Sequence, residues 1–317
     1  MTISQIFDEY ARKRSAAEAR ASAEHERIRE ILPELAVLED ERRLLYADLI
    51  GAALMNPSAR KKIEAEIHGY DEKISALLLR NGIQSLEPDY ECSLCQDSGY
   101  IEENGEKAFC PCLLERIYVE VFGAKPIGSL KGSFGKFDEL LFSEKNELLG
   151  GSETNPRKQI NNAKSYVERY SEAYPQFKRN NTVLIGKAGL GKTFLMECMA
   201  RRLYLKTRKI LFISAFALFG VFHKHRLGEM DDLDLIYDAD IIFLDDLGSE
   251  PVTQNVTREY FLQLLEKRTA ARKPLIVATN LSENDIRNRY GERAASRLFA
   301  NDDTARFFLI GQDLRLS

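Results

Sequence analysis

The sequence predicts an α/β protein in which a parallel sheet is flanked by helices and preceded by a helical hairpin and a small cysteine-bearing module. Three observations lead to this prediction. Short apolar segments alternate with helical segments towards the C-terminus, two amphipathic stripes occupy residues 28–77, and four cysteines lie within residues 92–112. A chain of 317 residues is also too long for one ordinary domain. We therefore expect a helical region over 1–85, a cysteine module over 86–125 and an α/β domain over 126–317.

The composition is that of an ordinary globular protein, with 44% hydrophobic and 30% charged residues. A net charge of −4 gives no general basic surface, so any contact with nucleic acid must be local. No run of about 18 apolar residues occurs, and the first twenty residues lack the apolar stretch of a secretory signal. We therefore expect no membrane contact and a cytoplasmic location.

The N-terminal region carries two amphipathic patterns with apolar residues at steps of three and four. The first comprises Ile28, Leu32, Leu35, Leu38, Leu45 and Leu49, and the second comprises Ile63, Ile67, Tyr70, Ile74 and Leu77. Between them lies Asn56-Pro57-Ser58, in which Asn56 or Ser58 could cap the second helix. Pro33 marks either a helix start or a kink, and the segment before it could be a separate helix. The pair predicts an antiparallel hairpin that serves either for packing alone or for holding a partner protein.

Four cysteines form two pairs, Cys92-x₂-Cys95 and Cys110-x-Cys112, and Asn104-Gly105 between them predicts a small hairpin. In a cytoplasmic chain such a cluster favours metal ligands over disulfides. Four thiolates would complete a tetrahedral zinc site and leave no open position for catalysis. Iron–sulfur chemistry and reduced structural thiols are the alternatives. The fifth cysteine, Cys198, is expected to be a buried small hydrophobe.

The C-terminal region alternates helices and strands. Helices are predicted over 158–174, 192–206, 215–225 and 256–272, and strands over 183–185, 210–214, 241–244 and 275–279. Strands separated by helices of this size imply a parallel sheet with helices on both faces.

The segment GKAGLGKT, residues 186–193, matches the phosphate-loop pattern, with an apolar strand before it and a helix after it. Glycines allow backbone N–H groups to surround phosphates, and the helix N-terminus adds positive potential. Lys192 is expected to reach the β- and γ-phosphates, and Thr193 to bind Mg²⁺. A chance glycine-rich turn is the alternative. The predicted ATP/ADP-binding residues are Gly186, Lys187, Ala188, Gly189, Leu190, Gly191, Lys192, Thr193, Phe194 and Asp245.

A second apolar run, IIFLDD at residues 241–246, ends in two acids. Ligands bind at the carboxyl ends of parallel strands, so we expect both acids at the nucleotide site. Asp245 is the predicted Mg²⁺ ligand, and Asp246 is predicted to polarise the attacking water. Asn280, which follows the strand over 275–279, could orient that water. The alternative is a surface turn with solvated acids.

The order of the phosphate loop, IIFLDDL, LIVATN, GERAASRLF and a terminal GQDLR resembles the AAA+ class, and within it the DnaC/DnaI helicase-loader and IstB-like ATP-binding family, over residues 130–317. The resemblance implies an AAA+ core in which Arg297 matches the arginine finger given to a neighbouring subunit. It also implies that Arg315 is a sensor near the γ-phosphate and Asn280 the first sensor. Arg293 is the second candidate for the finger, and Arg297 could instead only pair with an acid in its own helix.

The same resemblance implies an ATP-dependent loader that places a hexameric, DnaB-like replicative helicase on single-stranded DNA and forms a homo-oligomer when assembled. It also agrees with a zinc module here, since DnaI-like loaders carry a cysteine cluster ahead of the ATPase core. Basic clusters at 206–209 and 223–226, near Phe216, Phe219 and Phe222, are candidate DNA contacts. The alternative is that these aromatic residues belong to the core and that the basic residues form a solvated surface. The alternatives are an IstB-type transposition helper and a metabolic P-loop kinase. The acid pair and the segment GERAASRLF argue against the kinase.

Overall fold

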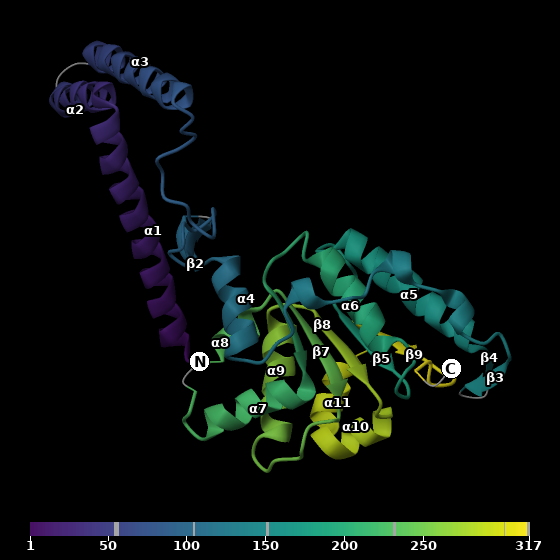
Figure 1. Ribbon diagram of the computed structural model, residues 1–317. Helices are drawn as coiled ribbons and strands as arrows, with labels where there is room; N and C mark the ends of the chain where they lie inside the picture. The colour runs from purple at the N-terminus through teal and green to yellow at the C-terminus, as the bar shows by residue number, and fades with distance from the viewer. Residues whose placement is uncertain (54–56, 104, 150–151, 231–232, 301, 316–317) are drawn as a thin grey trace. The chain divides into compact units, whose positions relative to one another are not determined.

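The computed structural model describes residues 1–53, 57–103, 105–149, 152–230, 233–300 and 302–315. The chain divides into two compact units (Figure 1). One comprises Ser4–Cys110 and is called the helical unit here; the other comprises Met1–Ile3 with Pro111–Ser317 and is called the core unit. The division into regions 1–85, 86–125 and 126–317 stays a prediction.

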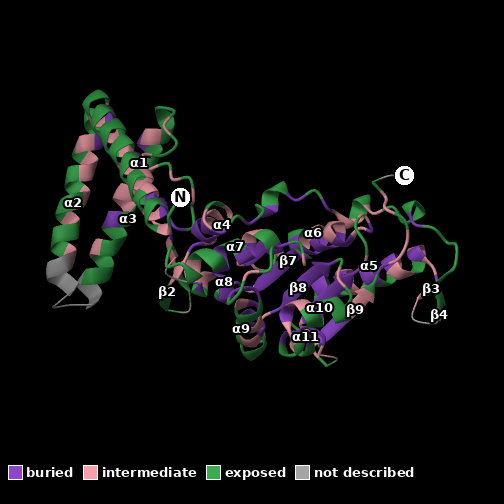
Figure 2. Ribbon diagram, turned by 90° about the horizontal axis from the view of Figure 1, so that it is seen from below, coloured by how far each residue is buried: buried purple, intermediate pink, exposed green. Residues whose placement is uncertain are grey.

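The helical unit begins with α1 (Ile3–Ile31), α2 (Pro33–Ala53) and α3 (Pro57–Arg80). Pro33 opens α2 instead of kinking a longer helix, because proline lacks the N–H that the first helical turn leaves unused. The helices α2 and α3 lie antiparallel (Figure 2), and the small core at their base contains Ile28, Leu35, Ile74 and Leu77. The predicted hairpin is therefore confirmed. The suggested caps, Asn56 and Ser58, lie outside the residues whose side chains are described.

A short β-hairpin follows, in which β1 (Tyr100–Glu103) pairs antiparallel with β2 (Glu106–Phe109). The hairpin is confirmed, although the predicted turn residue Asn104 lies outside the described residues. Phe7 of α1 stacks on Tyr100 with ring centroids 5.7 Å apart and lies 5.8 Å from the ring of Phe109. Aromatic packing thus joins the first turns of α1 to the cysteine-bearing segment.

The core unit contains a five-stranded parallel sheet in the order β6-β7-β8-β5-β9. The strands are β5 (Asn181–Ile185), β6 (Ile210–Ser214), β7 (Ile241–Leu247), β8 (Leu275–Thr279) and β9 (Thr304–Phe308). The first four were predicted, and their near-continuous burial is what a sheet covered on both faces requires. The edge strand β9 was missed, because Arg306 interrupts its apolar pattern and its last residues are partly exposed.

Helices cover both faces of this sheet (Figure 1). α5 (Pro156–Ala173) and α6 (Lys192–Leu203) lie on one face, and α7 (Ala215–Arg226) and α9 (Thr257–Ala270) on the other. The shorter helices are α4 (Pro111–Glu120), α8 (Asp234–Asp238), α10 (Glu283–Tyr290) and α11 (Glu292–Leu298). Between α4 and α5 lie three 3₁₀ turns, Ile127–Ser129, Phe134–Lys136 and Glu139–Leu141, and the small pair β3 (Glu147–Leu149) and β4 (Ser152–Thr154). The predicted fold class is confirmed.

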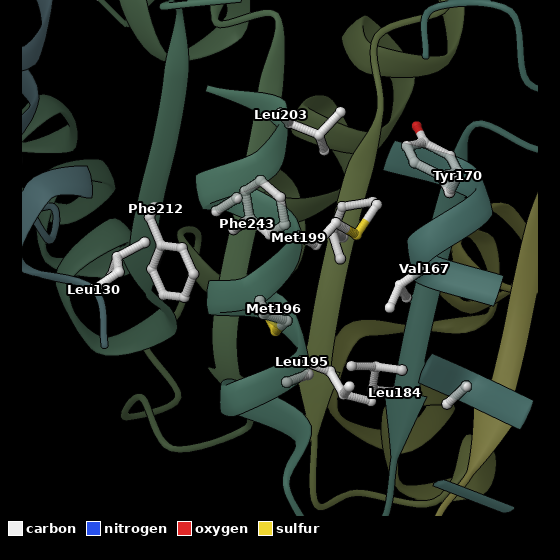
Figure 3. Packing of buried hydrophobic residues seen from close by; sticks show 14 of the residues in the cluster. Leu130, Val167, Tyr170, Leu184, Leu195, Met196, Met199, Leu203, Phe212 and Phe243 are labelled. Atoms are coloured by element: carbon white, nitrogen blue, oxygen red, sulfur yellow. The ribbon is translucent and has the colours of Figure 1, made fainter. Parts of the chain in front are cut away.

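The helix α6 is held on the sheet by apolar packing. Its side chains Leu195, Met196, Met199 and Leu203 are fully buried against strand residues that include Phe212 and Phe243 (Figure 3). Each such side chain contributes roughly 1.5–3 kcal/mol on burial. Cys198 is also buried, and burial raises the pKa of its thiol to about 12, as expected for a structural cysteine. This packing fixes the loop between β5 and α6 at the carboxyl end of the sheet.

Candidate nucleotide site

The loop between β5 and α6 has backbone geometry that only glycine adopts without strain. Gly191 caps α6 with φ 82°, and Gly189 has φ 74°. A Cβ atom on Gly189 would lie 1.7 Å from Oδ1 of Asp313, so a larger residue would collide with the C-terminal segment. Free backbone N–H groups at the start of α6 and the positive end of its dipole make this loop an anion site.

Lys192 lies across this loop. Its ammonium donates to the carbonyl oxygens of Gly186 at 2.6 Å and Lys187 at 2.7 Å, and to Oδ1 of Asn280 at 2.7 Å. Burial lowers the pKa of Lys192, and the nearby negative charges of Asp246 and Asp245 oppose that shift. The loop carbonyls and the end of β8 therefore position the lysine that was predicted to contact phosphate.

Both acids at the end of β7 line one cavity, although consecutive side chains of a regular strand point to opposite faces. The pairing of β7 with β8 shifts register between Leu244 and Leu247, and Asp246 has a positive φ of 56°. An irregularity of this kind re-aims a side chain. Oδ1 of Asp245 accepts from the Thr193 hydroxyl at 2.9 Å, and the amide of Asn280 donates to Oδ1 of Asp246 at 3.2 Å.

These residues form one wall of a cavity of about 520 Å³, a size typical of small-molecule sites. The apolar part of the lining, called the apolar wall here, consists of Phe137, Leu141, Phe142, Ile160 and Leu314. A cavity with polar groups at a helix N-terminus and an apolar wall suits a nucleotide, whose phosphates and base differ in the same way. The apolar wall was not predicted from the sequence, since most of it comes from a stretch without a motif; the aromatic residues of FDELLF, residues 137–142, were the available signal.

Arg315 also lines this cavity, where the predicted sensor should be. Its guanidinium contacts both carboxylate oxygens of Asp313, at 3.0 and 2.7 Å. Hydrogen bonding to Arg315 lowers the pKa of Asp313 to about 2, so this carboxylate is charged at neutral pH. The arginine is thus present at the site but engaged with an acid two residues away.

The two finger candidates lie elsewhere. Arg297 pairs with Glu266 at 2.8 Å, and Arg293 lies 3.6 Å from the same carboxylate. Glu266 belongs to α9 and not to the helix of Arg297, so the alternative of a partner within its own helix is wrong. Among the described residues that line the cavity, neither arginine is found.

The four predicted metal ligands converge. The sulfurs of Cys92, Cys95, Cys110 and Cys112 all lie within 4.8 Å of one another, and those of Cys92 and Cys110 are 3.8 Å apart. Tetrahedral zinc with Zn–S bonds of about 2.3 Å places two sulfurs about 3.8 Å apart. The buried carboxylate of Asp97 accepts from the backbone N–H groups of Glu91 and Cys92, which fixes the first pair. This donor set fits a metal ion.

Two charged residues near the site were not anticipated from the sequence. Lys125 places its ammonium 3.3 Å from Oδ2 of Asp245. Glu250, four residues after Asp246, has a fully buried side chain that pairs with Arg289 at 2.9 Å. Neither lies in a recognisable motif, since each contact joins segments far apart in the sequence.

Strand, phosphate loop and helix, with a polar residue at the end of the neighbouring parallel strand and an acid pair at the end of the strand beyond it, define a P-loop ATPase. Residues 168–297 match the family model described as IstB-like ATP binding protein, so this segment is similar to that family. Among the described residues, no helix is long and apolar enough to cross a membrane.

The chain is similar to several curated proteins. It is 26% identical over 235 residues to the phage-like element PBSX protein XkdC of Bacillus subtilis, covering 70% of this chain and 84% of the relative. It is 22% identical to the replicative helicase loader DnaC of Escherichia coli, covering 44% of this chain and 56% of the relative. For the replicative helicase loader DnaI of B. subtilis the identity is 26%, with 39% and 40% covered. The chain thus spans about half the length of these loaders.

A solved structure titled as DnaI is 21% identical, with 60% of this chain and 94% of that chain covered and a TM-score of 0.45. The sequence relatives and the family model confirm the resemblance that the motifs indicated.

Replacing Lys192 with alanine should reduce ATP hydrolysis at least about 100-fold, because it removes the one ammonium that bridges the loop and the end of β8. Steady-state phosphate release by the full chain measures the effect. Lys178→Ala, at an exposed lysine, is the matched control. Hydrolysis by Lys192→Ala at the rate of this control would contradict the assignment of the loop.

Proposed function

We propose that this chain is an ATP-dependent loader of a replicative helicase onto single-stranded DNA. The observation that carries the proposal is the presence, in one chain, of an ATPase domain similar to helicase loaders, a separate helical unit and a four-cysteine cluster. A long helical arm is suited to holding a partner protein. A cytoplasmic location remains a prediction from the sequence.

Within the ATPase site, each predicted residue has a role that its contacts support. Thr193 and Asp245, whose oxygens are 2.9 Å apart, would hold Mg²⁺, which neutralises phosphate charge when bound. Lys192 would contact the phosphates. Asp246 would accept a proton from the attacking water, and Asn280, bonded to both Lys192 and Asp246, would orient that water. Arg315 would turn from Asp313 to the γ-phosphate.

We propose zinc as the metal of the cysteine cluster. Four thiolates are a common zinc ligand set, and the spacing of the sulfurs fits a tetrahedral ion. The segment around the cluster has a two-stranded hairpin and few buried side chains of its own. A metal contributing on the order of 10 kcal/mol would compensate for that small core.

Protein purified without added zinc should therefore contain about one zinc ion per chain, measured by elemental analysis. Cys95→Ser should lose the metal, because three thiolates do not complete the shell. Cys198→Ala removes a buried thiol outside the cluster and should keep it. A folded chain without metal would indicate that the cysteines are reduced structural thiols. Iron in place of zinc would indicate an iron–sulfur cluster.

Among the candidate DNA contacts, we favour those on α7. Phe219 and Phe222 are buried in the core, as the alternative interpretation held, whereas Phe216 is 66% exposed. In the other basic cluster, Lys206 donates to the carbonyl of Tyr174 and Arg208 lies over the ring of Tyr204. We propose that Phe216 stacks on a nucleobase of single-stranded DNA. The exposed basic residues at the end of α7, His223, Lys224 and Arg226, would contact its phosphates.

Arg297 is proposed to act on the nucleotide of a neighbouring copy, because it does not reach the cavity of its own chain. Hydrolysis would then require assembly, either of this chain with itself or around the helicase. An arginine supplied in this way is worth roughly 10³–10⁵ in rate.

Arg297→Ala should bind ATP normally yet lose the part of the ATPase rate that rises with protein concentration, since the finger comes from another copy. The assay compares ATP affinity with specific activity over a range of chain concentrations. Arg293→Ala, at the adjacent exposed arginine, is the comparison variant. If only Arg293→Ala loses the concentration-dependent rate, the finger is Arg293; if neither does, assembly does not act through this helix.

A second candidate is an IstB-type transposition helper, which the description of the matching family favours. The ATPase core would be much the same in both proteins. The helical unit distinguishes them, because it would hold a helicase in one case and a transposase in the other.

Pull-down with the full chain, with and without ATP, should retain the cell's replicative helicase, because the helical unit presents a long arm for it. A chain lacking residues 4–110 is the control for binding through the core unit. Retention of a transposase and not the helicase would favour the second candidate and overturn the loader proposal.

A further inference from the structure

Lys125 is held at a fixed position beside the ATPase site. It lies between α4 and the first 3₁₀ turn, and its backbone N–H donates to the carbonyl of Phe212 in β6 at 2.7 Å. Its neighbours Ala124 and Ile127 are buried, and the N–H of Ala124 donates to the carbonyl of Tyr118 at 2.8 Å. The backbone of this segment therefore cannot shift without breaking contacts to the sheet and to α4.

The side chain of Lys125 extends from this anchor to the acid pair. Its ammonium lies 5.1 Å from the centre of the Phe212 ring and 3.3 Å from Oδ2 of Asp245. The other oxygen of Asp245 accepts from the Thr193 hydroxyl. Both oxygens of this carboxylate are thus engaged, one by a hydroxyl and one by a cation.

Asp245 is also the residue proposed above to hold Mg²⁺ with Thr193. A divalent ion bound there and the ammonium of Lys125 would repel each other because both are positive, and they would compete for the same carboxylate. The side chain of Asp245 is only 10% exposed, which weakens solvent screening of that competition.

We propose that Lys125 is a positioning residue that acts as the counter-ion of Asp245 until Mg²⁺ displaces it, and so sets the Mg²⁺ concentration at which nucleotide is held. This inference rests on the proposed Mg²⁺ role of Asp245. In the metal-free chain the lysine neutralises a nearly buried carboxylate and keeps it beside Thr193. When Mg²⁺ binds, the ammonium gives up the carboxylate oxygen, and the exposed part of its side chain allows it to move towards solvent.

A surface ion pair without function is the competing explanation, since exposed pairs contribute little. Two features distinguish the Lys125–Asp245 pair from an ordinary surface ion pair. Its backbone is bonded to the strand next to β7, and its acid belongs to the catalytic cavity and not to the surface. An effect on Mg²⁺ dependence is what separates the two explanations.

The test titrates Mg²⁺ into the full chain at a fixed concentration of a fluorescent ATP analogue and records the Mg²⁺ concentration at half-maximal binding. Lys125→Met keeps the aliphatic stem and removes the charge, and should lower that concentration about threefold to tenfold. Lys125→Arg keeps the charge and should stay near the wild-type value. Lys131→Met, at an exposed lysine that does not line the cavity, serves as the matched control.

An unchanged half-maximal Mg²⁺ concentration in Lys125→Met would overturn the proposal. Weak analogue binding by Lys125→Met at saturating Mg²⁺ would also overturn it, because the lysine would then act on the phosphates. Asp245→Asn separates this inference from the role on which it rests: if Asp245→Asn does not raise the Mg²⁺ requirement, the Mg²⁺ assignment itself fails. Circular dichroism checks the fold of each variant, and Lys125→Gln replaces Lys125→Met if the latter does not fold.

Discussion

The register shift at the end of β7 is the constraint on which the ATPase site depends. Without it, Asp245 and Asp246 would project to opposite faces of the sheet and only one could serve the cavity. The shift and the positive φ of Asp246 bring both acids to the side of the phosphate loop. The bond from Thr193 to Asp245 then ties the start of α6 to the end of β7, and Asn280 joins Lys192 to Asp246.

Much of this arrangement could be predicted from the sequence, because its elements are local patterns. The phosphate loop, the buried strands and the four cysteines each occupy a short stretch whose spacing carries the information. The register shift could not be predicted, since it arises from pairing between strands and leaves no mark in IIFLDD. The apolar wall, Lys125 and Glu250 were missed for a related reason: each reaches the site through tertiary contacts of a segment without a motif.

Glu250 shows how the acid pair and the helix with the finger candidates are joined within one chain. Its buried carboxylate accepts from the N–H of Gly248 at 2.9 Å, from Arg289 at 2.9 Å and from the hydroxyl of Tyr290 at 2.5 Å. Gly248 follows Asp246 by two residues, and Tyr290 precedes α11 by two. Breaking a buried pair of this kind typically costs 3–5 kcal/mol. The position of α11 is therefore fixed relative to the acid pair of the same chain.

The charges around the cavity explain which contacts must change when nucleotide binds. Lys125 and Arg315 are each paired with a carboxylate, whereas the ammonium of Lys192 donates to three neutral oxygens. Lys192 can therefore bind a phosphate without breaking an ion pair, whereas Lys125 and Arg315 must first separate from a carboxylate. Because hydrogen bonding to Arg315 lowers the pKa of Asp313 to about 2, acidification near neutral pH does not remove the charge that pairs with Arg315. Phosphate, with several charged oxygens, can compete with Asp313 for Arg315, so a ligand in the loop would act on both the loop and the proposed sensor arginine.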